Sequence, residues 1–92
     1  MFSTPTQINF SVDDINQRTI MELIAADRPG LLSEVAKVLV ALNVNIYASK
    51  IVTVGERAED VFYLTDDRGQ PLGSETQRVL EDRLVAALDA RT

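Results

Sequence analysis

The segment Asp27–Leu32 (Asp-Arg-Pro-Gly-Leu-Leu) has the residue types to bind a small ligand. Its proline and glycine interrupt an apolar strand, and the apolar spacing that follows predicts a helix over Pro29–Leu42. Backbone N–H groups at a helix start lack partners and carry the positive end of the helix dipole, so they suit a carboxylate. We expect Gly30, Leu31 and Leu32 to supply these N–H groups.

Two charged residues precede the expected helix. Asp27 can accept a hydrogen bond from an ammonium group, and Arg28 lies beside it in the same candidate site. A purely structural explanation also fits, in which Asp27 caps the helix, Pro29 starts it and Gly30 relieves crowding. The residues alone leave both explanations open.

A second charged group, Glu56, Arg57, Glu59 and Asp60, has three carboxylates that could hold Mg²⁺ or Ca²⁺. We favour a solvated hairpin turn in which Arg57 neutralises its neighbours. Asp66–Gly69 lacks the ligand spacing of a calcium loop. We therefore expect no metal, no cofactor and no catalytic residue in this chain.

Composition excludes several classes of function. The 92 residues suit one domain, and they include no Cys and no His, which disfavours thiol chemistry, His-based catalysis and the common transition-metal sites. The net charge of −5 disfavours nucleic acid as a partner. No segment has the features of a membrane span or a signal peptide, so we expect a cytoplasmic protein.

Periodicity predicts four strands and two helices. The strands are expected at Gln7–Val12, Arg18–Ala26, Val44–Val54 and Glu59–Thr65, and the second helix at 74–90. Ile46 and Ile51 can share a face of their strand only if a bulge lies between them, near Ala48.

Both helices show an apolar stripe and a start signal. Ser74 and Gln77 have the spacing of a capping box. The stripe positions are Leu31, Leu32, Val35, Val38, Leu39 and Leu42 in the first helix and Leu80, Leu84, Ala87 and Leu88 in the second.

The order of elements predicts an α+β fold of the ferredoxin-like type. This fold is a four-stranded antiparallel sheet with both helices on one face. The chain lacks the usual last strand, and the additional first strand is expected to take its place beside Arg18–Ala26. Two strands look apolar on both faces, so we expect a partner chain or sister domain on the open face or at a sheet edge.

The run from Met21 to Leu32, a strand followed by Asp-Arg-Pro-Gly-Leu-Leu, resembles the opening of an ACT domain. The run from Ile51 to Asp66, with its Gly-Glu-Arg-x-Glu-Asp-x-Phe core, resembles the C-terminal ACT domain of the bifunctional PII uridylyltransferases and uridylyl-removing enzymes. The similarity extends from about Phe10 to Leu88.

This resemblance implies a single ACT regulatory domain over residues 1–92, with residues 1–6 expected to be flexible. Such enzymes add UMP to the nitrogen-signalling PII protein and remove it. Their tandem ACT domains sense glutamine, and the catalytic domains precede them. The resemblance therefore implies a regulatory fragment of an enzyme that controls nitrogen assimilation, with PII as a partner of the parent enzyme.

In the ACT family the ligand lies between two units, so a strand of the partner closes the site. Asn45 and Tyr47 are our candidates for that strand. Two functions remain open. One is an allosteric domain that senses an amino acid, with glutamine favoured, and the other is an interaction or dimerisation module that binds no ligand.

Overall fold

The computed structural model describes residues 4–89. Residues 1–3, half of the segment expected to be flexible, lie outside this range, as does Ala90 at the expected end of the second helix. The elements in chain order are β1 Gln7–Asp13, β2 Arg18–Ala26, α1 Leu31–Ala41, β3 Asn45–Val54, β4 Arg57–Thr65 and α2 Ser74–Asp89.

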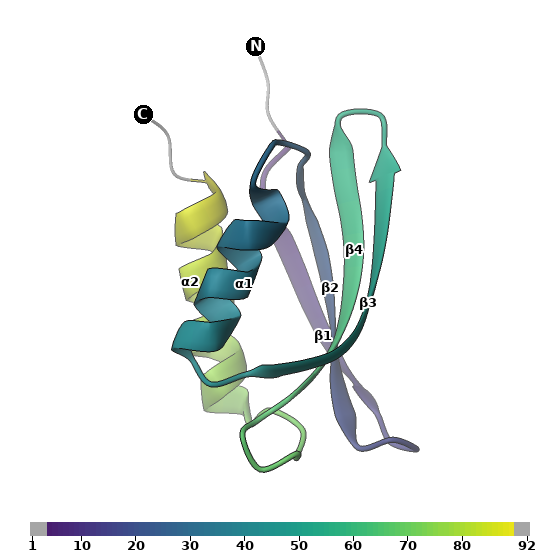
Figure 1. The fold of residues 1–92 in the computed structure, drawn as a ribbon, viewed down its shortest axis with the longest axis vertical. Helices are drawn as coiled ribbons and strands as arrows, with labels where there is room; N and C mark the ends of the chain where they lie inside the picture. Colours follow the sequence, from purple (N-terminus) through teal and green to yellow (C-terminus); the bar gives the residue numbers. More distant parts are fainter. Residues whose placement is uncertain (1–3, 90–92) are drawn as a thin grey trace.

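The four strands form one antiparallel sheet in the order β1-β2-β4-β3. Both helices lie on the same face of this sheet (Figure 1). β1 pairs with β2 and so occupies the edge position that the usual last strand would fill. The predicted α+β ferredoxin-like topology is confirmed, including the substitution of the first strand for the last.

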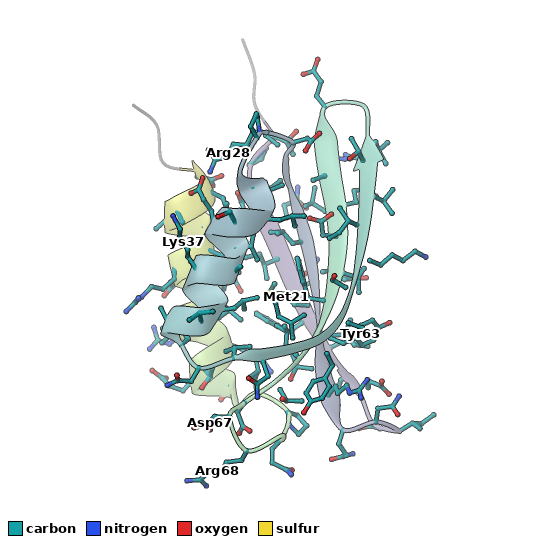
Figure 2. All side chains as sticks on the ribbon, in the orientation of Figure 1. Met21, Arg28, Lys37, Tyr63, Asp67 and Arg68 are labelled. Atoms are coloured by element: carbon teal, nitrogen blue, oxygen red, sulfur yellow. The ribbon has the colours of Figure 1, made fainter. Side chains whose placement is uncertain are left out.

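The core lies between the helices and the sheet. Met21 and Leu23 of β2 are fully buried on the helix face, whereas Tyr63 of β4 lies on the opposite face (Figure 2). Most of the other large buried side chains come from both helices and β4, and two come from loops; they are Leu31, Val35, Leu39, Val44, Phe62, Leu64, Leu72, Leu80, Leu84 and Leu88. The alternation in β2 and β4 therefore follows the predicted parity.

β3 is an edge strand whose ten residues are all exposed. Its register with β4 shifts between Ile46 and Ala48, which is the predicted bulge. The shift leaves Ile46 opposite Leu64 and Ile51 opposite Asp60, so both isoleucines face the helix side.

The start of α1 and the capping interaction of α2 differ from the predictions, whereas α2 begins at Ser74 as expected. α1 begins at Leu31 because Gly30 has a left-handed φ of 81°, so Pro29 lies before the helix and not in its first turn. Leu32 is 45% exposed and does not belong to the buried stripe. The predicted capping box at α2 is wrong, since the Gln77 side chain donates to the Leu72 carbonyl, 3.0 Å away.

No helix within residues 4–89 has both the length and the apolar character needed to cross a bilayer.

Candidate functional site

A pocket of about 210 Å³ lies where the β2–α1 loop meets the sheet. One wall comes from the loop and the first turn of α1: Asp27, Arg28, Gly30, Leu31, Leu32 and Ser33. The other wall comes from Ile51 and Thr53 of β3 and from Ala58 and Asp60 of β4. Five of the seven predicted site residues therefore line one pocket. Their role as ligand contacts stays a prediction.

The start of α1 presents free backbone donors to this pocket. The Leu31 N–H donates a hydrogen bond to the Arg28 carbonyl at 3.2 Å. The helical hydrogen bonds begin with the Glu34 N–H, which donates to the Gly30 carbonyl at 3.0 Å. Leu32 and Ser33 have no helical carbonyl before them to accept their N–H groups. Of the predicted donors, the N–H of Leu31 is therefore occupied, whereas that of Leu32 and that of the adjacent Ser33 have no acceptor within residues 4–89.

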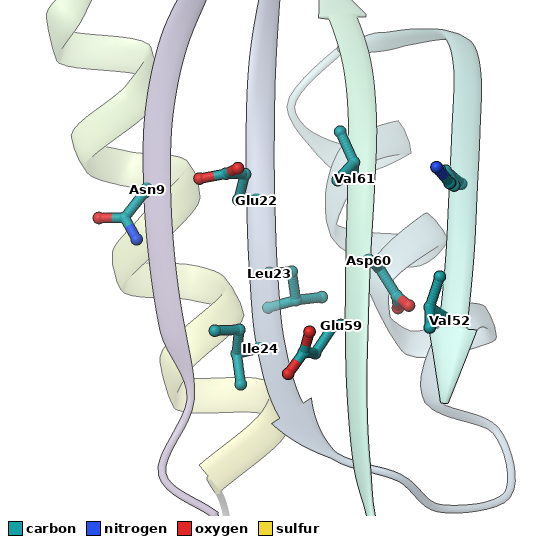
Figure 3. Close-up of a pocket in the computed structure, with 9 residues that line it drawn as sticks. Asn9, Glu22, Leu23, Ile24, Val52, Glu59, Asp60 and Val61 are labelled. Carbon is teal, nitrogen blue, oxygen red and sulfur yellow. The ribbon is translucent and has the colours of Figure 1, made fainter. Parts of the chain in front are cut away.

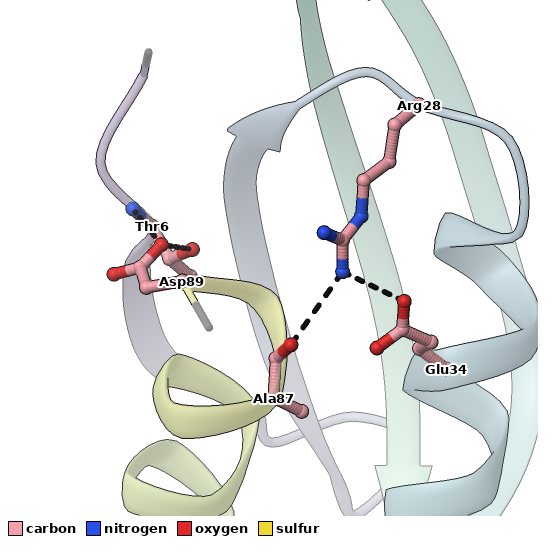
Figure 4. A network of polar contacts seen from close by, with 5 residues as sticks. All are labelled: Thr6, Arg28, Glu34, Ala87 and Asp89. Atoms are coloured by element: carbon pink, nitrogen blue, oxygen red, sulfur yellow. Dashed lines mark hydrogen bonds and ion pairs between the residues drawn. The ribbon is translucent and has the colours of Figure 1, made fainter. Parts of the chain in front are cut away.

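The loop that carries these donors is fixed at several points. The Asp27 N–H donates to the Glu56 carbonyl at 2.9 Å, which ties the loop to the β3–β4 turn. The Arg28 guanidinium binds the Glu34 carboxylate at 2.7 Å and the Ala87 carbonyl at 3.5 Å, near the end of α2 (Figure 4). Arg28 is therefore committed to structural contacts, and Asp27 makes no side-chain cap of α1.

Asp60 is the residue at this site that sequence reasoning missed. It is 2% exposed, and neither of its carboxylate oxygens has a hydrogen-bond partner. Burial raises the pKa of this carboxyl, the nearby Val52 backbone amide opposes the increase, and the Asp27 carboxylate adds to it. An unpaired buried carboxylate is costly and suits a site that receives a positive charge.

Of the three carboxylates in the predicted solvated turn, Glu59 pairs with Arg57 as expected, whereas Asp60 is buried. Arg57 binds Glu59 at 2.6 Å on the open face of the sheet. Asp60 points to the helix face, opposite Leu23 and Ile51. The sequence contained one indication of this, because Asp60 shares its face of β4 with apolar residues at every second position. No three potential metal ligands gather in the part of the chain that the structure describes.

Asn45 and Tyr47 lie near the other end of β3 and do not line the pocket of their own chain. The Asn45 side chain donates to the Asp66 carbonyl at 3.2 Å. The Arg18 guanidinium lies 4.6 Å from the centre of the Tyr47 ring. Their predicted role in closing a partner's site stays a prediction.

A second hollow, of about 310 Å³, lies on the open face of the sheet (Figure 3). The charged residues that line it are Glu22, Lys50, Glu59 and Asp60, and its apolar residues include Ile24 and Val61. Figure 3 shows the Asp60 carboxylate turned toward β3, near Val52. We take the pocket at α1 as the candidate site because it combines free N–H donors with an unpaired buried carboxylate.

Comparison with known families gives a match over most of the chain. Residues 19–82 match the model of the ACT domain. The match begins in β2 and ends in α2, so it contains both walls of the pocket.

Similar proteins carry the name bifunctional uridylyltransferase/uridylyl-removing enzyme. The one from Legionella pneumophila (strain Corby) is 40% identical over 84 residues, which is 91% of this chain and 10% of that protein. The one from Vibrio campbellii is 41% identical over 87 residues, or 95% of this chain and 10% of that protein. The chain thus spans about a tenth of the length of these relatives. From its fold and from the family match, the chain belongs to the ACT domain family.

Proposed function

We propose that this chain is a sensing domain for a free amino acid, with glutamine as the favoured ligand. The observation that carries the proposal is the pocket at α1, where two free N–H groups face a carboxylate-bearing wall. A zwitterionic amino acid needs donors for its carboxylate and an acceptor for its ammonium group. At about 210 Å³ the pocket is smaller than those of drug-sized ligands, which suits such a small molecule.

The parent protein in this proposal is a PII uridylyltransferase and uridylyl-removing enzyme of the cytoplasm. The relatives of that name support it, as does the tenth of their length that this chain covers. Glutamine in the domain would shift the parent enzyme from adding UMP to PII toward removing it. In this role the domain controls nitrogen assimilation allosterically.

The proposed partner within the assembly is a sister ACT domain or a second copy of this chain. Five of the exposed large hydrophobic residues lie on β3: Ile46, Tyr47, Ile51, Val52 and Val54. Leu32 and Val40 of α1 are also exposed, at 45% and 74%. A partner at this edge would pair the free backbone groups of β3 and bring its own Asn45 and Tyr47 toward the pocket.

The same exposed edge favours a second candidate, an interaction module that binds no ligand. A strand that is exposed along its whole length is a template for pairing with another chain. In this case the pocket would be a by-product of the loop geometry, and Asp27 and Gly30 would be structural.

Isothermal titration calorimetry against L-glutamine, L-glutamate and the other amino acids separates the two candidates. Selective heat with glutamine is expected, together with weaker binding by Asp27→Ala. The mass in solution should be measured on the same sample to detect a dimer. No heat at millimolar concentration from a folded dimer would favour the interaction module. Repeating the titration with both tandem ACT domains would show whether the sister domain completes the site.

A further inference from the structure

Asp60 lines the α1 pocket, and its burial is not explained by a side-chain partner among residues 4–89. Its neighbours on the same face of β4 are Ala58 and Phe62, and the residues opposite it on the adjacent strands are Leu23 and Ile51. None of these side chains can donate a hydrogen bond. The carboxylate is 2% exposed, so water does not replace the missing donors as it does for a surface carboxylate.

The pocket has hydrogen-bond donors on its α1 side and a carboxylate on its sheet side. Leu32 and Ser33 offer N–H groups at the positive end of the α1 dipole. Asp60, on the sheet side, has two buried carboxylate oxygens without a hydrogen-bond partner among residues 4–89. A molecule that fits both walls carries an anionic and a cationic group a few bonds apart, as an α-amino acid does.

We propose that Asp60 binds the ammonium group of the ligand and makes the site selective for amino acids over analogues that lack this group. This assignment rests on the proposed function, and it names the residue that sets the ligand class. A 2-oxo acid or a deaminated acid could use the helix donors but would leave Asp60 unpaired. Removal of a partner from a buried polar group is costly, so the site discriminates against such analogues.

Asp60 is better placed for this role than Asp27. Asp27 is exposed, and water weakens any ion pair that it forms. Asp60 is buried, where the lower effective dielectric strengthens an ion pair. We therefore expect Asp27 to contribute less to affinity than Asp60, although both face the same pocket.

This assignment makes binding depend on pH. Burial and the Asp27 carboxylate raise the pKa of the empty Asp60, and a bound ammonium group would lower it again. A protonated Asp60 must then release its proton to solvent when the ligand binds. The charged groups that line the pocket with it are Asp27 and Arg28, and the Arg28 guanidinium is held by Glu34. Affinity should rise with pH through the titration of Asp60 and then level off.

The test is calorimetry of the wild-type chain, Asp60→Asn, Asp27→Asn and Glu59→Gln, with L-glutamine and with its analogue that lacks the α-ammonium group. Glu59→Gln is the matched control, because it removes the same charge from the neighbouring residue on the opposite face. Asp60→Asn should weaken glutamine binding about tenfold or more and remove the rise of affinity with pH that the titration of Asp60 causes. Glu59→Gln should leave the glutamine affinity and its pH dependence unchanged. The analogue should bind the wild-type chain and Asp60→Asn with similar affinity.

A second measurement does not depend on the variants. Carboxyl carbon NMR of the wild-type chain should show Asp60 titrating above the usual aspartate range, with its midpoint lowered by saturating glutamine. If folded Asp60→Asn binds glutamine with wild-type affinity and pH dependence, the assignment of Asp60 is wrong while amino acid sensing stands. If neither this chain nor the tandem domains bind any amino acid, the proposed function and this assignment both fail.

Discussion

Asp60 and Asp66 carry the same side chain six positions apart, and the fold surrounds them in opposite ways. Asp66 follows β4 and organises a loop, since its Oδ1 accepts the N–H groups of Arg68 at 2.8 Å and Gln70 at 2.9 Å. These backbone hydrogen bonds lower the pKa of its carboxyl. Asp60 lies within β4, buries both oxygens without a donor, and has a raised pKa.

The difference separates a structural carboxylate from a functional candidate. Asp66 stabilises the native loop in its ionised form, so its role is complete within the chain. Asp60 destabilises the native state when ionised, and no residue within 4–89 offsets this cost with a hydrogen bond. A side chain that costs stability and faces a pocket is the stronger candidate for ligand binding.

The largest expected effect is that of Asp60→Asn on stability. The amide has nearly the same shape but carries no charge, so we expect an increase of about 1–3 kcal/mol in the free energy of unfolding near neutral pH. Because the folded pKa is raised, Asp60 penalises the folded state progressively as pH rises above 3.8. Urea unfolding at several pH values should show the gain shrinking as pH falls toward 3.8. An equal or larger gain in acid would contradict this explanation.

Asp66→Ala should change stability in the other direction. Its loss leaves the N–H groups of Arg68 and Gln70 without their shared acceptor, so the melting temperature should fall by a few degrees near neutral pH. Since the folded pKa is lowered, the stabilisation exists above the usual value of 3.8 and is lost as pH falls through the folded pKa. Thermal melts of both chains should therefore converge in acid. Unchanged melting near neutral pH would show that the loop does not need Asp66.

Gly30→Ala tests the loop that faces Asp60. Gly30 has a φ of 81°, and an added Cβ would meet no atom of residues 4–89 within 4 Å, so the cost is conformational and about 1 kcal/mol. Gly73→Ala is the matched control, because its Cβ is equally free of contacts and its φ is not positive. Chemical unfolding should separate the two variants. Equal stabilities would show that the left-handed conformation of Gly30 carries no cost.

The smallest effect is expected from Glu59→Gln. Its ion pair with Arg57 is partly exposed on the open face, where such pairs contribute little, so stability should change by less than about 0.5 kcal/mol. The same unfolding assay applies. A loss as large as the gain from Asp60→Asn would mean that the two faces of β4 are not independent.

Much of the architecture was predictable because it follows from local pattern. Strand alternation located β2 and β4, and the mismatch between Ile46 and Ile51 predicted the bulge in β3. The extra strand and the missing last strand predicted that β1 would lie beside β2. The Asp-Arg-Pro-Gly segment predicted the loop wall of the candidate site, because this wall requires only that a strand ends and a helix begins there.

The second wall was not predictable in the same way. Asp60 was assigned to a solvated turn because its neighbours in sequence are charged, whereas its neighbours in space are Leu23 and Ile51. Leu32 fitted the apolar stripe by spacing, but the position of α1 over the sheet leaves it at the pocket. Both errors arise because burial depends on which segments pack together.

The sequence by itself determined the elements, their order and the family, since these depend on residue types and periods along the chain. Only the tertiary structure decided that the Asp60 carboxyl group of β4 and the first turn of α1 line the same pocket. That meeting requires the antiparallel register between β4 and its neighbours, which sets the face and height of each side chain. The charge of Asp60 is visible in the sequence, but its lack of a partner is a property of the packed fold.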